Sequence, residues 1–492
     1  MAGLGNAIKE EASWGKTWNG ADAKVKTGSA CLDMFGRAGA MRQASVTDKE
    51  LLLSKAFAED ADIAVKLLFY TRDIRGGYGE RDTFTDMLRH LAEINVESVE
   101  KNLWAILEFG RAKDLYCLIG THAEKAMWAF MKNQFELDLE NMEQGKSISL
   151  LAKWLATPDS HSKRTAALGI KTAKKLGYKY VEVSKYSKKL KDLRKYLDLP
   201  EAKMCAGKWN EIEYSKCASK FLLKNRRALQ RHDPDRYAEY FKKVDSGEEK
   251  INTGALTPCD IIQKVAYDYT KELETMWNNL EDVCKGNAIV MADTSGSMTW
   301  ASGKSMRPID VAVALSMYFA QRNKGDLKDM FMTFNSTPQF VELNGATLKD
   351  NYNIVQKAPW GGSTNLEAAF NLLLRTCING GVTQEEMPDA IVIVSDMQIN
   401  CVRGLNTSNR MTFYDAMKQK YEQAGYKMPQ VVFWNVNALN STFHASKEDA
   451  GVSLVSGYSA NVFKQVMENI GTTPYELMMT VVNSERYKDI VA

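Results

Sequence analysis

The sequence Asn287-Ala-Ile-Val-Met-Ala-Asp-Thr-Ser-Gly-Ser-Met-Thr-Trp300 decides the fold of the C-terminal part of the chain. Its apolar run, residues 288–292, has the length of a buried parallel strand and is followed by Asp293, Ser295 and Ser297. Ligands of open α/β sheets bind beyond the carboxyl ends of the strands. Three oxygen-bearing side chains at such an end predict a small divalent cation there. Asp and Ser are also common turn formers, so a plain polar loop is the alternative.

Two later segments favour the cation hypothesis. Residues 360–366, Trp-Gly-Gly-Ser-Thr-Asn-Leu, form a glycine turn that leads into a helix and carries the hydroxyl of Thr364. Residues 390–396, Ala-Ile-Val-Ile-Val-Ser-Asp, form a second apolar strand that ends at the carboxylate of Asp396. We therefore expect all three segments at corresponding ends of α/β units.

These three separated motifs, in this order, resemble the von Willebrand factor A family with its metal-ion-dependent adhesion site. In that family an Asp-x-Ser-x-Ser loop, a Thr and a later Asp share one Mg²⁺ or Mn²⁺ ion. By position, the resemblance implies the ligands Asp293, Ser295, Ser297, Thr364 and Asp396. Mg²⁺ takes six oxygens, so this set leaves a position open for an Asp or Glu of a protein partner, or for a phosphate. One departure is Asn365, at a position where an acidic residue is frequent in related proteins.

The sequence around these motifs alternates strand-like and helical segments. We expect further strands at 330–334, 339–343 and 430–435, and helices at 308–319, 365–376, 412–424 and 460–470. This alternation predicts a mostly parallel sheet covered on both faces. Residues 286–492 should therefore form a doubly wound, Rossmann-like α/β domain.

The preceding part of the chain has helical signals instead. After an entry segment, residues 1–45, capping signals and helical periods recur up to an amphipathic link at 260–284. We expect an all-α module of HEAT-like stacked helix pairs over residues 46–285, although no clean sequence period is visible. The loop at 75–82, Arg-Gly-Gly-Tyr-Gly-Glu-Arg-Asp, follows a helix and lacks a Walker lysine. It favours a tight interhelical turn over a phosphate cradle.

Length and composition indicate an intracellular globular protein of two or three domains. The 492 residues are 45% hydrophobic and 25% charged, ordinary values for such proteins. The eight cysteines are spaced singly, with no C-x-x-C pair, which indicates reduced thiols rather than disulfides or a zinc cluster. Residues 1–26 contain no apolar core of a signal peptide, and no run approaches the roughly 18 apolar residues of a membrane span. We expect a cytoplasmic protein without a membrane partner.

Charge is distributed unevenly along the chain. Residues 160–231 contain 20 Lys and Arg but 6 Asp and Glu, a local charge of +14, so the remainder carries −11 of the net +3. Tyr178, Tyr180 and Tyr186 lie among these lysines, and surfaces for single-stranded nucleic acid combine cations with aromatic rings. The alternative is that the lysines only solvate helix surfaces. On charge alone, the candidate RNA contacts are Lys163, Arg164, Lys171, Lys174, Lys175, Lys188, Lys189, Arg226 and Arg227.

A second resemblance begins in this basic tract. The segments 151–155, Leu-Ala-Lys-Trp-Leu, and 250–258, Lys-Ile-Asn-Thr-Gly-Ala-Leu-Thr-Pro, with shorter matches between them, resemble the helical TROVE module of Ro-type RNA-binding proteins. Some relatives of those proteins pair this module with a von Willebrand A domain. The resemblance covers about residues 30–475 and is looser in the helical half. It implies a ring of helical repeats that binds single-stranded RNA ends in its hole and small structured RNA on its outer surface.

Together these observations predict a ribonucleoprotein scaffold rather than an enzyme. None of the five histidines lies beside the Asp-x-Ser-x-Ser loop in sequence, and the chain has no G-x-S-x-G, Walker A or H-E-x-x-H motif. A metal-dependent phosphoesterase is a minor alternative, because oxygen-bound Mg²⁺ polarises phosphoryl groups. The main alternative is a protein-only adaptor, in which both modules bind polypeptides and no RNA.

Overall fold

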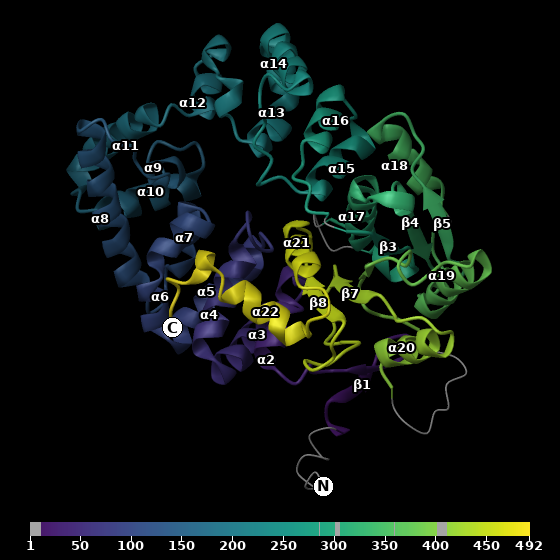
Figure 1. Cartoon of the computed structure of the whole chain (residues 1–492). Coiled ribbons are helices and arrows are strands. Elements are labelled where there is room, and N and C mark those ends of the chain that lie inside the picture. Colours follow the sequence, from purple (N-terminus) through teal and green to yellow (C-terminus); the bar gives the residue numbers. More distant parts are fainter. Residues whose placement is uncertain (1–10, 285, 301–305, 359, 401–410) are drawn as a thin grey trace. The chain divides into compact units, whose positions relative to one another are not determined.

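The structure, a computed structural model, describes residues 11–284, 286–300, 306–358, 360–400 and 411–492 (Figure 1). Two compact units are present, and each contains chain segments that are distant in sequence. The first unit comprises residues 1–83 and 256–488, and the second comprises residues 84–255 and 489–492. The first ten residues of the expected entry segment lie outside the described residues. None of the described helices combines the length and apolar character needed to cross a bilayer.

A six-stranded sheet forms the centre of the first unit, as the alternating pattern predicts. Its order is β5-β4-β3-β6-β7-β8, and every strand pair is parallel except β4 with β5. The chain therefore starts in the middle of the sheet, moves to one edge, and returns to build the other half. The strands are β3 (Ala288–Asp293), β4 (Met330–Phe334), β5 (Gln339–Glu342), β6 (Ala390–Ser395), β7 (Gln430–Asn435) and β8 (Val452–Ser456).

Helices cover both faces of this sheet, so the doubly wound prediction is confirmed. On one face, alternate residues such as Ile289, Ile391 and Phe433 share a core with α19 (Leu366–Gly380) and α20 (Phe413–Gln423). On the other face, α17 (Pro308–Arg322) packs against β3, β4 and β6. There Phe319 of α17 contacts Trp434 of β7 with a ring-centroid distance of 5.7 Å. Full burial on both faces explains why these strands are uniformly apolar.

Residues 1–83 belong to this α/β unit. The domain boundaries expected from the sequence place residues 1–45 in an entry segment and residues 46–83 in the helical module instead. The amide of Gly39 donates to Ser456 Oγ at 3.0 Å, and a Cβ at position 39 would lie 2.7 Å from the Ser456 carbonyl oxygen. The side chain of Arg42 bonds the buried Glu80 carboxylate and stacks on Tyr458. The spacing of apolar residues along a helix cannot predict such packing, because the contacting residues are far apart in the sequence. The segment contributes β1 (Trp14–Lys16), β2 (Asp22–Lys24), α2 (Ala30–Phe35), α3 (Val46–Glu59) and α4 (Ala61–Arg72).

Further helices of the first unit precede or follow the strands. Two lie before the sheet, α15 (Pro258–Tyr267) and α16 (Lys271–Asn278), and α18 (Leu348–Lys357) lies between β5 and α19. The last ones are α21 (Asn461–Glu468) and α22 (Pro474–Val482). The strand β8 and the helices α18 and α22 were not expected from the sequence.

The Gly-rich loop after α4 is a tight turn. Gly77 and Gly79 donate backbone hydrogen bonds to the carbonyl of Asp73, and a Cβ at Gly77 would lie 2.1 Å from the Tyr70 carbonyl oxygen. The glycines are therefore required by close backbone approach. The Asp73 carboxylate accepts from Arg486 Nη2 and from the Tyr487 hydroxyl, both at 2.8 Å.

The second unit is helical throughout its described residues. Its longest helix is α8 (Glu124–Glu143). Apolar residues recur with helical spacing from Val96 to Leu107, but two helices form there and meet at Asn102, whose amide donates to the carbonyls of Ser98 and Val491. The other helices are α5 (Arg81–Ile94), α6 (Val96–Lys101), α7 (Leu103–Phe109), α9 (Leu151–Trp154), α10 (Lys163–Lys175), α11 (Val183–Tyr196), α12 (Pro200–Cys205), α13 (Ser219–His232) and α14 (Pro234–Ser246).

The ion pair between the buried carboxylate of Asp73 and the partly exposed guanidinium of Arg486 yields a stability prediction. Burial alone raises the pKa of Asp73, but the hydrogen bonds and charge of Arg486 outweigh it and hold this pKa below its usual value. We expect Arg486→Met to lower the free energy of unfolding by about 1–3 kcal/mol at neutral pH, because it leaves the buried Asp73 carboxylate without its counter-charge. Because the folded pKa is depressed, the stabilisation is present above the unfolded pKa and is lost as pH falls through the folded value.

Urea titrations at several pH values measure this difference. The control is Lys488→Met, which removes an exposed i,i+3 pair with Glu485 and should cost at most about 1 kcal/mol. Equal losses in the two variants would contradict the assignment.

Candidate cation site at the sheet edge

The candidate site lies where the strand order reverses, between β3 and β6. These two strands are adjacent and parallel, and Ala292 pairs with Val394. Beyond β3 the chain leads to α17 on one face of the sheet, and beyond β6 it leads to α20 on the other. Helices that diverge in this way leave a crevice at the carboxyl ends of the two strands. Asp293 is the last residue of β3, and Asp396 directly follows β6.

Four of the five expected cation ligands form one hydrogen-bonded group. Asp293 Oδ1 accepts from the Ser295 amide at 2.9 Å, and the hydroxyls of Ser295 and Ser297 are 3.2 Å apart. The side chain of Ser297 in turn bonds the Asp396 carboxylate. Asp293, Ser295 and Asp396 are buried, whereas Ser297 is exposed. The group thus opens to solvent on the side of Ser297.

A glycine turn brings the fifth residue, Thr364, to the same loop. Gly361 donates to the Thr294 carbonyl at 2.7 Å, with φ at +97°. A Cβ at Gly362, whose φ is +81°, would lie 2.5 Å from Ser336 Oγ. Both residues have left-handed φ and Gly362 is also in close contact with Ser336, so the Gly-Gly pair of the motif has a conformational origin. The neighbouring Asn365 accepts from the Ala368 amide at 3.1 Å and thereby caps α19.

The electrostatics of the two carboxylates favour a cation. Burial and the charge of Asp396 raise the pKa of Asp293 to about 7. Burial also raises the pKa of Asp396. A cation relieves both costs, because it neutralises two like charges that are buried at the same sheet edge. The donors are all oxygens, which suits Mg²⁺ or Mn²⁺. Among the residues described, no group of three or more His, Cys, Asp or Glu is placed to hold a metal, so the fit depends on the hydroxyls.

Several residues around this site were not expected from the sequence. Ser395 donates to Asp293 Oδ2 at 2.6 Å and accepts from the Met397 amide at 3.0 Å. Asn19, at the tip of the β1–β2 hairpin, donates to Thr364 Oγ1 at 3.3 Å and to the Gln398 carbonyl. Ser395 was detectable as the last residue of an apolar strand. No local signal marks Asn19.

One histidine lies near the site in space. His444 is buried, its Nε2 lies 3.0 Å from the Met397 carbonyl oxygen, and its ring packs between Phe413 and Phe433. Burial lowers the pKa of His444 to about 4, so the imidazole is neutral at physiological pH. The carbonyl that it contacts belongs to a residue with φ at +64°, directly after Asp396. His444 therefore supports the turn that carries this carboxylate.

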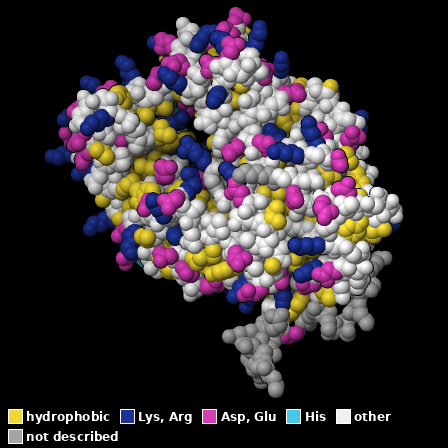
Figure 2. Space-filling model, viewed as in Figure 1, with side chains coloured by type: hydrophobic (Ala, Val, Ile, Leu, Met, Phe, Trp, Pro, Cys, Tyr) yellow, Lys and Arg dark blue, Asp and Glu magenta, His cyan; other side chains and the backbone are white. Residues whose placement is uncertain are grey.

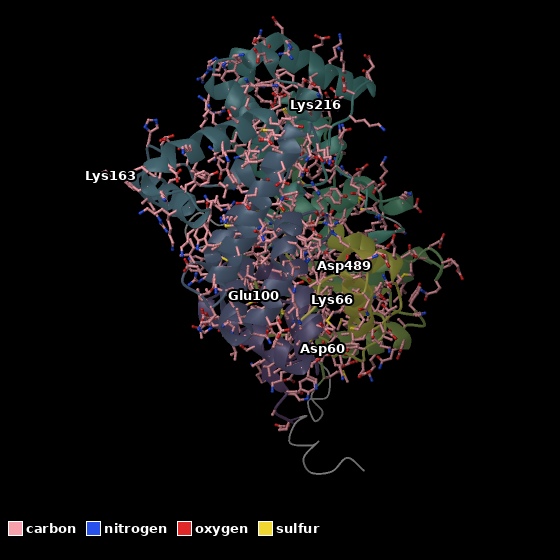
Figure 3. All side chains as sticks on the ribbon, turned by 90° about the vertical axis from the view of Figure 1, so that its left-hand side faces the viewer. Asp60, Lys66, Glu100, Lys163, Lys216 and Asp489 are labelled. Carbon is pink, nitrogen blue, oxygen red and sulfur yellow. The ribbon has the colours of Figure 1, made fainter. Side chains whose placement is uncertain are left out.

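The basic candidates separate into exposed and buried members. Lys163, at the start of α10, projects from the helical unit (Figure 3). Lys171 is half-buried and pairs with Glu124 at 3.0 Å. Arg226 is buried, and its Nη1 lies 3.4 Å from the Leu223 carbonyl, so it does not belong to the surface set. The remaining exposed candidates are Arg164, Lys174, Lys175, Lys188, Lys189 and Arg227.

The tyrosines of this tract also differ in exposure. Tyr186 is buried and donates to the Ala156 carbonyl at 3.1 Å, so it is a core residue and cannot stack on a base. Tyr180 is 72% exposed, and Lys174 lies over its ring at 5.5 Å. Lys189 lies over Tyr178 at 5.8 Å. Over α8 and α11, Figure 2 shows basic side chains interspersed with acidic ones.

These features define a class of protein: a helical unit combined with an open α/β sheet that carries an oxygen-lined site at its switch point. Family comparison divides the chain at about residue 290, whereas the sheet-containing unit also includes residues 1–83 and 256–286. A domain of unknown function (DUF2828) matches residues 17–130 and 122–291, more than half of the chain, and the chain belongs to this family. A second domain of unknown function (DUF7788) matches residues 287–489, the part that contains the sheet.

Two individual proteins are similar over nearly the whole chain. The "Uncharacterized protein L728" of Acanthamoeba polyphaga mimivirus is 28% identical over 95% of this chain and 86% of its own length. The crystal structure of the Deinococcus radiodurans RO (RSR) protein matches 92% of this chain and 99% of its own, with a TM-score of 0.48 and 14% identity. At that identity and score the second similarity does not extend to function.

The two buried carboxylates generate a prediction about metal-linked stability. In EDTA we expect Asp293→Asn to melt at a higher temperature than the wild type, because it removes a like-charge repulsion. The folded pKa of Asp293 is raised, so the wild type loses stability as pH rises through about 7, and the difference should grow with pH. Mg²⁺ at 100 times its dissociation constant should stabilise the wild type by about 2.7 kcal/mol and the variant much less.

Differential scanning calorimetry with and without Mg²⁺ measures both effects. Asp326→Asn, at an exposed position of the same unit, is the control and should respond to Mg²⁺ as the wild type does. A wild-type melting temperature that Mg²⁺ leaves unchanged would contradict the site.

Proposed function

We propose that the chain is an RNA-binding scaffold whose α/β unit, a von Willebrand A-type domain, docks a protein partner through a divalent cation. The observation that carries the docking function is the buried pair Asp293 and Asp396 at the switch point, with hydroxyls beside it. Asp293, Ser295, Ser297, Thr364 and Asp396 would hold the cation. When bound, Mg²⁺ or Mn²⁺ supplies an electrophilic position that accepts a carboxylate oxygen of the partner.

The arrangement favours binding over catalysis. The hydroxyls of Ser295 and Ser297 lie 3.2 Å from each other, and His444 supports the turn at Met397 through its contact with the carbonyl there. A general base must reach the proton that it abstracts, and the buried imidazole is directed at a backbone carbonyl instead. We therefore propose a binding protein and not an enzyme.

The RNA-binding function rests on α10, α11 and the turn between them. Exposed lysines alternate there with the half-exposed ring of Tyr178 and the exposed ring of Tyr180. Lysines attract phosphates, and tyrosine faces stack on bases without selecting a sequence. This combination supports single-stranded RNA as the ligand, and a helical module of HEAT-like repeats is the expected scaffold for it.

A protein-only adaptor is the second candidate, and the local ion pairs favour it. Several lysines of the tract already contact acids of the same unit, which reduces the charge left for phosphates. These pairs are Lys171 with Glu124, Lys185 with Glu182, Lys203 with Asp198, Lys208 with Glu211 and Lys216 with Glu213. The salt dependence of binding distinguishes the two candidates.

The docking proposal predicts that bound Mn²⁺ keeps a replaceable water. Water-proton relaxation should show tight Mn²⁺ binding by the wild type, and acetate should lower the relaxation enhancement as a carboxylate displaces that water. Asp293→Ala/Asp396→Ala should reduce Mn²⁺ affinity by at least about 100-fold, since both charged ligands are lost. The control Asp326→Ala/Glu385→Ala removes two exposed acids of the same unit. Mn²⁺ affinity that is the same in both double variants would refute the proposal.

The RNA proposal predicts a salt-dependent affinity that charge reversal removes. We expect a fluorescent single-stranded RNA to bind with a log–log salt slope of roughly −0.7 per phosphate contacted. The variant K163E/R164E/K174E/K175E should bind weakly to every sequence tested. K324E/K328E/K357E/K418E reverses four exposed lysines of the α/β unit and should retain binding. If both variants lose affinity equally, the contacts do not lie on α10.

A further inference from the structure

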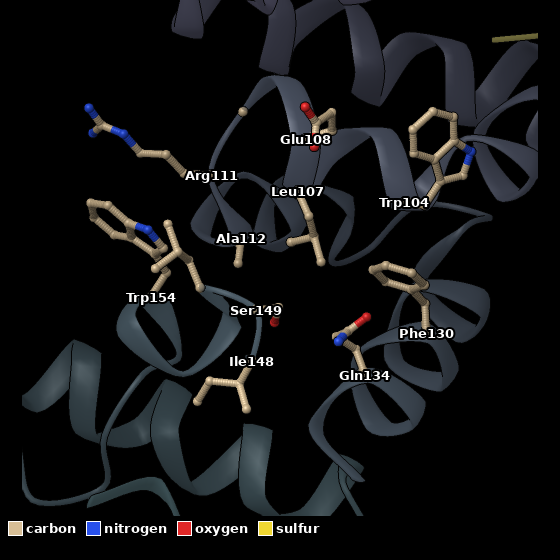
Figure 4. Close-up of a pocket in the computed structure, with 12 residues that line it drawn as sticks. Trp104, Leu107, Glu108, Arg111, Ala112, Phe130, Gln134, Ile148, Ser149 and Trp154 are labelled. Carbon is tan, nitrogen blue, oxygen red and sulfur yellow. The ribbon is translucent and has the colours of Figure 1, made fainter. Parts of the chain in front are cut away.

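A cavity of about 440 Å³ lies within the helical unit, separate from the basic surface. Its walls come from α7, α8, α9 and the turns that precede α9 (Figure 4). Three aromatic side chains line it, Trp104, Phe130 and Trp154, together with Leu107 and Ile148. Trp104 is 39% exposed, so part of this aromatic lining faces solvent. The volume falls in the range of small-ligand pockets, roughly 300–1,000 Å³.

The polar side chains of the cavity have a fixed orientation. Asp138 is buried and accepts from Gln134 Nε2 at 2.9 Å, from the Ser149 amide at 2.9 Å and from Ser149 Oγ at 2.6 Å. Because the amide nitrogen of Gln134 donates to the Asp138 carboxylate, the amide oxygen of Gln134 is the atom that faces the cavity as an acceptor. Figure 4 shows Glu108 on the other side of the space, across from Gln134. The cavity therefore presents acceptors on two walls.

Cationic groups lie at the rim beside Trp154. The guanidinium of Arg111 lies 5.0 Å from the centre of the Trp154 ring, and the ammonium of Lys153 lies 5.7 Å from it. Lys153 is paired with Glu201 at 2.9 Å, so Arg111 is the cation at this rim that disfavours a cationic ligand and attracts an anionic one. A ligand that suits all parts of the cavity has a flat aromatic body, hydrogen-bond donors at its edge and a negative charge attached to it.

An unpaired nucleotide meets these requirements. We propose that this cavity binds one extruded base of single-stranded RNA, a base that carries an exocyclic amino group, with its phosphate near Arg111. Adenine, guanine and cytosine each have such a group, whereas uracil presents carbonyl oxygens at that position and meets the acceptors of Glu108 and Gln134 unfavourably. The proposal rests on the proposed RNA binding and adds to it a specific pocket and a base preference.

Equilibrium binding of hexa-adenylate (A6) and hexa-uridylate (U6) to the full chain tests the pocket. We expect A6 to bind more tightly than U6. Trp104→Ala should weaken A6 binding on the order of 10-fold, because it removes a stacking surface. Glu108→Gln lies at an exposed position, should leave the fold intact, and should reduce the preference for A6 over U6. Tyr267→Ala, at an 86% exposed ring of the other unit, is the control and should change neither affinity.

The outcomes separate this pocket from the basic surface. Charge reversal on α10 should weaken A6 and U6 alike and leave their ratio unchanged, whereas the cavity variants should change the ratio. If Glu108→Gln binds A6 and U6 with the same affinities as the wild type does, the pocket is overturned while RNA binding remains in place. If neither oligonucleotide binds, calorimetry with AMP and UMP decides: AMP binding that Trp104→Ala abolishes supports the pocket, and no binding of AMP at millimolar concentration overturns it.

Discussion

The parallel pairing of β3 with β6 is the constraint on which the candidate site depends. This register places the ends of the two strands at the same sheet edge, where Asp293 is the last residue of β3 and Asp396 directly follows β6. Helices that follow the two strands pack on opposite faces of the sheet, and both acids are buried at this edge. Like charges brought together without water destabilise a fold unless a counter-charge is present. The two buried carboxylates therefore lower the stability of the fold locally, at the position where a bound cation can offset this loss.

The segment that precedes the helical unit contributes to this sheet domain directly. Its hairpin tip reaches the candidate site, where Trp18 donates from its amide to Gln398 Oε1 at 2.8 Å and Thr17 bonds the Ile399 carbonyl at 2.6 Å. Residues after β8 close the other end of the same unit, since Arg486 and Tyr487 hold the turn after α4. Domain boundaries drawn along the sequence divide this unit, because its cohesion comes from residues about 400 positions apart, such as Asp73 and Arg486.

Sequence patterns correctly predicted the elements whose ends are marked by neighbouring residues in the sequence. The strands at 330–334 and 430–435 have the expected ends, because each is an apolar run bounded by polar residues. The strand β8 was missed because Ser453 and Ser456 interrupt its apolar run, and both serines are buried by tertiary contacts. The break at Asn102 likewise depends on a carbonyl near the C-terminus. The expected ligand residues are local to strand ends and turns, whereas Asn19 is brought to Thr364 only by folding.

Exposure determines how much of the basic tract can act on a ligand. Of nine charged candidates, Arg226 is buried and Lys171 already contacts Glu124, so the net charge of the segment overstates its capacity for phosphates. The buried Tyr186 removes one stacking face in the same way. A surface with fewer free cations binds RNA with weaker salt dependence, and it relies more on stacking. For the proposed RNA binding, we therefore expect aromatic side chains to contribute alongside charge, at Tyr180 on the surface and at Trp104 in the cavity.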